Sequence, residues 1–156
     1  MNMIPVLSDR LPVAPVPVQG KPNRILVVDD DSRIRGLERA ILQRAGHHVD
    51  TATDGEIAWR ALVASNYDLL LTDYCMPRVS GLELVRQVRV AQLALPVVMV
   101  SGSLASLDTA TLIHDPWARI DAFVHKPFTV VELLTAVNNV LFRGVAGARS
   151  RQPALA

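Results

Sequence analysis

Charged and hydroxyl side chains directly follow four short apolar segments of this sequence. They are Asp29, Asp30 and Asp31 after RILVV, Asp73 after DLLLT, Ser101 after PVVMV, and Lys126 after AFVH. Carboxylates that gather without histidine or cysteine suit Mg²⁺, which binds one or two carboxylates and leaves room for phosphate oxygens. A carboxylate can also act as a nucleophile and become an aspartyl phosphate, while a metal ion and a lysine neutralise the phosphoryl oxygens. If these side chains meet, they predict phosphoryl transfer to Asp73, with Mg²⁺ held by Asp29 and Asp30.

The pattern between these residues decides whether they can meet. Five short apolar runs, at residues 24–28, 48–52, 68–72, 96–100 and 122–125, alternate with segments of helical periodicity. Apolar strands separated by amphipathic helices are typical of a parallel sheet that is covered on both faces. The sequence therefore predicts an α/β fold, a doubly wound five-stranded parallel sheet with five helices. Functional groups in such sheets gather at the carboxyl ends of the strands, so the four polar positions are expected to share one edge.

Hydroxyl residues and apolar spacing mark the expected helices. Ser32, Ser80 and Thr129 are each expected to cap or begin a helix. Further helices are expected over residues 55–65 and, poorly formed, over residues 104–114. The predicted apolar face of the first helix consists of Ile34, Leu37, Ile41 and Leu42.

The two ends of the chain differ in composition from its middle. Residues 1–22 hold five of the ten prolines, which disfavour a helix, and they are expected to form a flexible arm. Residues 144–156, GVAGARSRQPALA, are small and basic and are expected to form a flexible tail. The folded domain is expected to span residues 23–143, which is an ordinary size for a single domain.

The composition argues against several classes of protein. The chain has 16 Lys and Arg against 15 Asp and Glu, a net charge of +1 that does not favour a nucleic-acid or membrane surface. Cys75 is the single cysteine, which excludes an internal disulfide and a cysteine-cluster metal site and fits a cytoplasmic location. No apolar run reaches the roughly 18 residues of a membrane helix. The first residues also lack the pattern of a secretory signal.

Four segments, in order, resemble the receiver domain of two-component response regulators over residues 23–143. ILVVDDD resembles the acidic end of the family's first strand, and LLLTDYCMPRVSGLEL resembles its phosphoacceptor segment. VVMVSG resembles the strand that carries the switch hydroxyl, and HKPF resembles the lysine–proline segment. The resemblance implies a flavodoxin-like sheet with strand order 2-1-3-4-5 and a role in phosphorelay signalling.

The resemblance also implies a chemical role for each site residue. Asp73 would accept a phosphoryl group from a histidine kinase or a histidine phosphotransfer protein. Asp29, Asp30 and Asp73 would hold Mg²⁺, with Cys75 contributing only its backbone carbonyl. Lys126 would bridge Asp73 and the phosphoryl group. Cys75 itself replaces the polar residue that the family often has two positions after the acceptor, a change expected to slow the approach of water to the acyl phosphate.

A switch is implied as well. Ser101 would bind the phosphoryl group and move toward it, and Phe123 occupies the family's aromatic switch position without a tyrosine hydroxyl. The Lys126–Pro127 peptide bond would be cis. Phosphorylation would then shift the population of the chain toward a form with an altered protein-contact surface.

The resulting expectation is a stand-alone receiver, because the sequence after residue 143 leaves no room for an output domain. It would not be an enzyme beyond its own phosphoryl transfer and slow self-dephosphorylation. It would pass its signal to a downstream protein, without binding nucleic acid or membrane, and homodimerisation is left open.

One alternative is an interaction module that keeps the fold without phosphorylation. Another is an aspartate phosphohydrolase, since Asp29 and Asp31 have D-x-D spacing, although a cap region is lacking. A dinucleotide-binding protein is disfavoured because no G-x-G-x-x-G follows the first strand.

Overall fold

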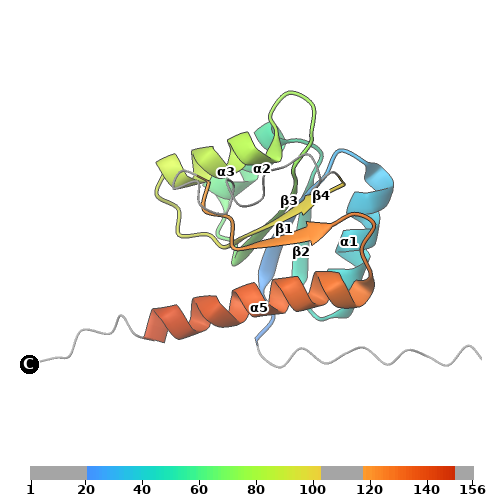
Figure 1. The fold of residues 1–156 in the computed structure, drawn as a ribbon. Helices are drawn as coiled ribbons and strands as arrows, with labels where there is room; N and C mark the ends of the chain where they lie inside the picture. Colours follow the sequence, from blue (N-terminus) through green and yellow to red (C-terminus); the bar gives the residue numbers. More distant parts are fainter. Residues whose placement is uncertain (1–20, 103–117, 150–156) are drawn as a thin grey trace, which may run out of the picture.

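A five-stranded parallel sheet forms the centre of the computed structural model, which describes residues 21–102 and 118–149, with side chains to residue 143 (Figure 1). The strands are β1 (Arg24–Val28), β2 (His48–Ala52), β3 (Leu69–Asp73), β4 (Val97–Ser101) and β5 (Ala122–His125). They are ordered β2-β1-β3-β4-β5, and every neighbouring pair is parallel. The predicted sheet and strand order are therefore confirmed.

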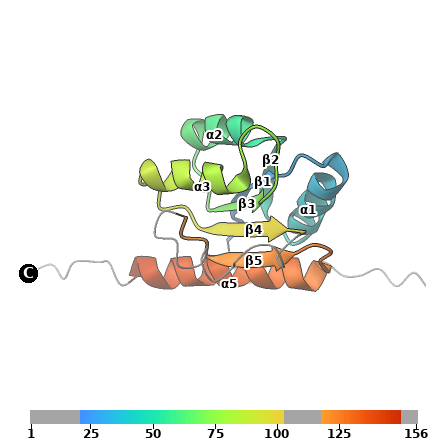
Figure 2. The same ribbon diagram turned by 45° about the horizontal axis from the view of Figure 1, so that its top comes forward.

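Helices cover both faces of this sheet. The described helices are α1 (Ser32–Arg44), α2 (Gly55–Ala64), α3 (Gly81–Val90) and α5 (Val130–Arg149). The two views agree that α2 and α3 lie on one face while α1 and α5 lie on the other (Figures 1 and 2). The helix expected over residues 104–114, and residues 1–20 of the expected arm, fall outside the described residues. Helix α5 continues to Arg149, so residues 144–149, expected to be part of a flexible tail, are helical in the structure.

Aliphatic side chains fill the space between the sheet and each helical layer. Because side chains alternate along a strand, Leu26 and Val28 of β1 face α2 and α3, while Ile25 and Val27 face α1 and α5. All four are fully buried. A sheet that is apolar on both faces leaves only its strand ends and loops for polar groups, which concentrates any chemistry there. None of the helices in residues 21–102 and 118–149 could span a bilayer.

Helix α1 differs from its prediction at two points. Asp31, not Ser32, caps it, because the Asp31 carboxylate accepts hydrogen bonds from the amides of Arg33 and Ile34. Leu37, expected to face the core, is 47% exposed, whereas its neighbour Glu38 is only 1% exposed. The inward stripe of α1 therefore includes an acid that the apolar pattern did not predict.

The predicted beginnings of α3 and α5 are correct. Ser80 Oγ accepts a hydrogen bond from the Glu83 amide at 3.2 Å, and Glu83 accepts one from the Ser80 amide at 3.0 Å. Thr129 and Glu132 form the same reciprocal pair at 3.2 and 2.7 Å. Such capping boxes satisfy amides at a helix start that would otherwise lack partners. They fix where the chain re-enters a helix after Asp73 and after Lys126.

Candidate functional site

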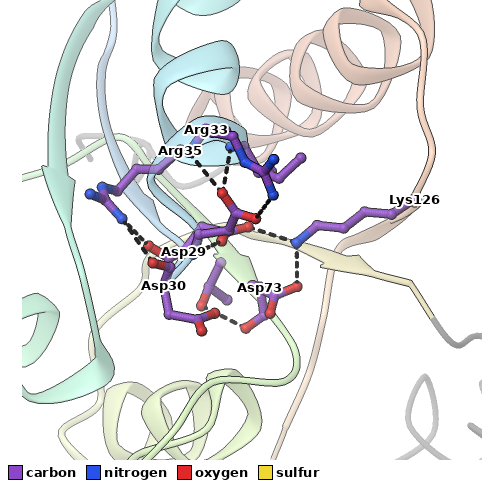
Figure 3. Close-up of polar contacts among 9 residues, drawn as sticks. Asp29, Asp30, Arg33, Arg35, Asp73 and Lys126 are labelled. Carbon is purple, nitrogen blue, oxygen red and sulfur yellow. Dashed lines mark hydrogen bonds and ion pairs between the residues drawn. The ribbon is translucent and has the colours of Figure 1, made fainter.

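Lys126 joins two carboxylates at the carboxyl edge of the sheet. Its Nζ donates hydrogen bonds to Asp29 Oδ2 at 2.6 Å and to Asp73 Oδ1 at 2.8 Å (Figure 3). The two acids are 97 and 53 residues away from Lys126 in sequence, and they are 1% and 7% exposed. The fold thus brings together the ends of β1, β3 and β5, as the sequence predicted.

Burial and charge set the protonation of this cluster. Burial raises the pKa of Asp73, an effect that Lys126 opposes and that Asp29 and Asp30 reinforce. Burial alone would lower the pKa of Lys126, but its hydrogen bonds to Asp29 and Asp73 outweigh that effect and raise it. Lys126 is therefore a stable cation. Asp29 and Asp73 contact the single ammonium of Lys126, and Asp30 adds a further negative charge near Asp73, so the cluster carries more negative charge than Lys126 neutralises and favours a further cation.

Within the run of three aspartates, Asp29 and Asp31 have different roles. Asp29 points to Lys126, whereas Asp31 turns away to cap α1. Arg35 Nη1 holds the backbone between them, donating to the carbonyl oxygens of Asp29 at 2.7 Å and Asp30 at 3.4 Å (Figure 3). The described residues contain no group of three or more His, Cys, Asp or Glu already arranged to bind a metal. The donor atoms that the side chains of Asp29, Asp30 and Asp73 offer are carboxylate oxygens, which are hard ligands.

Ser101 ends the strand next to β3, and Cys75 follows Asp73 by two residues. Ser101 is the last residue of β4 and is 2% exposed, and its carbonyl oxygen accepts a hydrogen bond from the Lys126 amide at 2.8 Å. Cys75 is exposed and lies in the loop that follows Asp73. The structure therefore places Ser101 beside Lys126.

Phe123 lies farther back along its strand. It pairs in register with Met99 of β4 and packs, partly buried, against the core layer under α2 and α3. The Lys126–Pro127 peptide bond is cis, as the resemblance implied.

The end of β3 is held by Gly81, the first residue of α3. The Gly81 amide donates to the Tyr74 carbonyl at 3.1 Å, and the Tyr74 amide donates to the Val100 carbonyl at 2.8 Å. A Cβ at Gly81 would lie only 1.9 Å from the Asp73 carbonyl oxygen. Only glycine allows the backbone of α3 to approach Asp73 this closely.

We expect Gly81→Ala to destabilise the chain by about 1 to 3 kcal/mol, because Asp73 or the start of α3 has to move. The free energy of unfolding in urea measures this effect. Gly36→Ala is the matched control. Gly36 lies in α1, and a methyl group added there would meet nothing within 4 Å, so alanine is expected to stabilise the helix. Equal stability of Gly81→Ala and the unmodified chain would contradict the close approach.

Two features near the site were not predicted from the sequence. Glu38 on α1 is buried, and its Oε1 has no hydrogen-bond partner among the residues that the structure describes; burial, then Asp29, raises its pKa to about 8. Arg78, in the loop after Asp73, forms an ion pair with buried Asp54 at the start of α2. Glu38 could have been recognised by its position, four residues after Ile34 and three before Ile41, on the apolar stripe of a helix. The sequence has no such periodic pattern that could have predicted the Arg78–Asp54 ion pair, which joins two loops.

The sequence matches the family described as the response regulator receiver domain over residues 25–138. It is 36% identical over 125 residues to the transcriptional regulatory protein ResD of Bacillus subtilis, covering 80% of this chain and 50% of ResD. It is 31% identical to the alkaline phosphatase synthesis transcriptional regulatory protein PhoP of the same species, covering 83% of this chain and 52% of PhoP. The chain therefore spans about half the length of these curated relatives.

Solved structures agree with the sequence comparison. A CheY-like response regulator receiver domain protein from Methanospirillum hungatei is 27% identical, with a TM-score of 0.74, covering 81% of this chain and 99% of that one. The chemotaxis response regulator CheY4 of Vibrio cholerae is also 27% identical, with a TM-score of 0.69, covering 77% of this chain and 99% of its own. The likeness extends over nearly the whole of each solved domain.

Proposed function

This chain belongs to the response regulator receiver domain family, and from that premise we propose that Asp73 is its phosphoacceptor. The phosphoryl donor is a phosphohistidine, on a histidine kinase or a histidine phosphotransfer protein. The receiver domain comprises residues 23–143. Residues 103–117, within this range, lie outside the part of the chain that the structure describes. The observation that carries the proposal is the ammonium of Lys126 between Asp29 and Asp73, at 2.6 and 2.8 Å.

The proposed transfer exchanges one bond to phosphorus for another. An oxygen of the Asp73 carboxylate attacks the phosphorus, a P–O bond forms, and the P–N bond to the donor imidazole breaks. The imidazole leaves as the neutral base once it has taken a proton. Lys126 keeps its contact to Asp73 and neutralises charge on the phosphoryl oxygens. The hydroxyl of Ser101, at the end of the neighbouring strand β4, binds a further phosphoryl oxygen.

The residues around Asp73 fit Mg²⁺, which would supply charge neutralisation on the phosphoryl oxygens when bound. Asp29, Asp30 and Asp73 provide carboxylates, and Cys75 provides its backbone carbonyl. This set of hard oxygen donors is the kind that Mg²⁺ prefers over softer metals. The excess of carboxylates over Lys126 in this cluster supports the same assignment. Magnesium also keeps several waters, so it does not need a complete cage of side chains.

Phosphorylation is proposed to act on a protein-contact surface through Ser101 and Phe123. Ser101 is buried at the end of β4, and Phe123 lies on the adjacent edge strand β5. A phosphoryl group that binds one arrangement of these side chains better than another shifts the population toward it. The proposed output is contact with a downstream protein, which requires neither nucleic acid nor membrane binding by residues 23–143.

The experiment is to measure the intact mass of the protein after incubation with acetyl phosphate and Mg²⁺. We expect a gain of one phosphoryl group that is suppressed by EDTA, because the transfer depends on the cation. A second arm presents a phosphorylated histidine kinase in place of acetyl phosphate. If neither donor labels the protein while a known receiver is labelled in parallel, the proposal is wrong. The chain would then be an interaction module that keeps the fold without phosphorylation.

A further inference from the structure

An ion pair joins two loops beside the acidic cluster. Arg78, in the loop of residues 74–80 that follows Asp73, donates from Nη2 to Asp54 Oδ2. The Asp54 side chain is 4% exposed, and it also caps α2 by accepting a hydrogen bond from the Ile57 amide at 2.9 Å. A carboxylate buried at the start of α2 therefore holds an arginine whose own side chain is 69% exposed.

A backbone contact supports the same connection. A Cβ at Gly55, directly after Asp54, would lie 2.6 Å from Val79 Cγ1 and 2.9 Å from the Val79 carbonyl oxygen. The start of α2 therefore approaches the loop of residues 74–80 closely at two successive positions, Arg78 and Val79. The contact and the ion pair both fix this loop against the start of α2.

The backbone of Arg78 adopts a conformation that is unfavourable for a residue with a side chain. Its φ angle is 69°, in the left-handed region that side-chain-bearing residues rarely occupy. Glycine would adopt this conformation without penalty. An arginine at this position keeps the loop in the left-handed conformation and adds a tether to a buried acid, which a glycine could not provide.

The tethered loop carries a backbone group of the proposed site. The loop begins at Tyr74, whose amide donates a hydrogen bond to the Val100 carbonyl. It ends just before Gly81, whose amide donates a hydrogen bond to the Tyr74 carbonyl. Between these anchors lies Cys75, and the Met76 side chain is buried in the core layer under α2 and α3. The Arg78–Asp54 pair holds the outer part of the loop, beyond the point where Met76 enters the core.

We propose that the Arg78–Asp54 ion pair is a positioning device that holds the loop of residues 74–80 so that the Cys75 carbonyl serves the Mg²⁺ of the proposed site. This inference rests on the proposed function and deepens it. The guanidinium of Arg78 is paired with Asp54 rather than with Asp73, so it acts on the site through the loop backbone. Residues that orient a metal's ligands typically change its affinity by about 10- to 100-fold when they are removed.

The test is Arg78→Gly, which keeps the left-handed backbone and removes the tether. We expect the Kd for Mg²⁺, measured by calorimetry on the full chain, to rise about tenfold. Electrostatics alone predicts the opposite, because removing a cation leaves the Asp54 charge to attract Mg²⁺. Labelling by acetyl phosphate should slow at low Mg²⁺ and recover at high Mg²⁺, since the acceptor itself is intact.

Three further variants complete the experiment. Asp54→Asn retains a capping side chain, and it should weaken Mg²⁺ binding as Arg78→Gly does. The double variant should be no weaker than either single variant, because both remove the same interaction. Arg60→Ala, which breaks the exposed ion pair of α2 with Glu56, should leave the Kd unchanged.

Unchanged Mg²⁺ affinity in Arg78→Gly would overturn the inference, even if the variant unfolds more easily, because the pair would then be only a structural link. That result differs from a failure of the proposed function. If the unmodified chain neither binds Mg²⁺ nor takes up a phosphoryl group, the proposed function and this inference are both wrong.

Discussion

Asp73→Asn is expected to abolish phosphoryl uptake from acetyl phosphate completely. An amide lacks the nucleophilic oxygen that forms the acyl phosphate, and it removes one carboxylate from the proposed Mg²⁺ ligands. The variant should still fold, because asparagine has the same shape and Lys126 keeps its hydrogen bond to Asp29 at 2.6 Å. Intact mass measures the uptake, and thermal unfolding confirms that the variant is folded.

Asp31→Asn is the matched control for this experiment. Asp31 is in the same acidic cluster of the sequence, but its side chain caps α1, and asparagine caps helices equally well. This variant is expected to be labelled as fully as the unmodified chain. Labelling of Asp73→Asn at the normal level would instead place the acceptor on another carboxylate. Asp29 would then be the leading candidate, as in an aspartate phosphohydrolase.

The sheet could be predicted from the sequence because its strands are dictated by a strong and local signal. A run such as Ile25 to Val28 is apolar without interruption, rich in β-branched residues and followed directly by aspartates, which together favour a strand buried on both faces. Once the strands are parallel, Asp29, Asp73 and Lys126 must share an edge. Their position at one edge follows from topology, whereas their contacts with one ammonium, at 2.6 and 2.8 Å, are known from the structure.

The parts that could not be predicted depend on packing and on contacts between loops. Leu37 and Glu38 are adjacent, and hydrophobicity alone assigns the leucine to the core, whereas the helical stripe assigns the glutamate. The pairing of Arg78 with Asp54 joins residues 24 positions apart in two loops. Loops carry no periodic pattern, so their mutual approach is set by the elements that they connect rather than by their own residues.

Glu38→Gln is expected to stabilise the chain at pH 7, and this stabilisation should be about 3 kcal/mol larger at pH 7 than at pH 4.5. The pKa of Glu38 rises from 4.5 to about 8 because the carboxyl is buried, with Asp29 reinforcing and Lys126 opposing the rise. Each unit of difference between the folded and unfolded pKa corresponds to about 1.4 kcal/mol of unfolding free energy. Glutamine removes this dependence because it carries no charge at either pH.

The sign follows from which form the folded state prefers. A raised carboxyl pKa means that the fold favours the neutral acid, so stability is complete below pH 4.5 and is lost as the pH rises toward 8. Urea unfolding of the unmodified chain and of Glu38→Gln at pH 4.5 and 7, in Mg²⁺-free buffer, measures how the free energy of unfolding of each changes with pH. Magnesium is omitted because a bound cation near Asp29 would itself favour the ionised form of Glu38.

Glu83→Gln provides a control of opposite sign. Hydrogen bonds from the backbone and side chain of Ser80 lower the pKa of Glu83, so its contribution is present above the unfolded pKa and is lost in acid. Glutamine at position 83 should therefore reduce stability at pH 7, where glutamine at position 38 increases it. If the effects of both substitutions on the free energy of unfolding change with pH in the same direction, the inference that Glu38 is buried in its neutral form is wrong. If the expected contrast holds, the chain retains beneath Asp29 and Lys126 an acid that destabilises its fold at neutral pH.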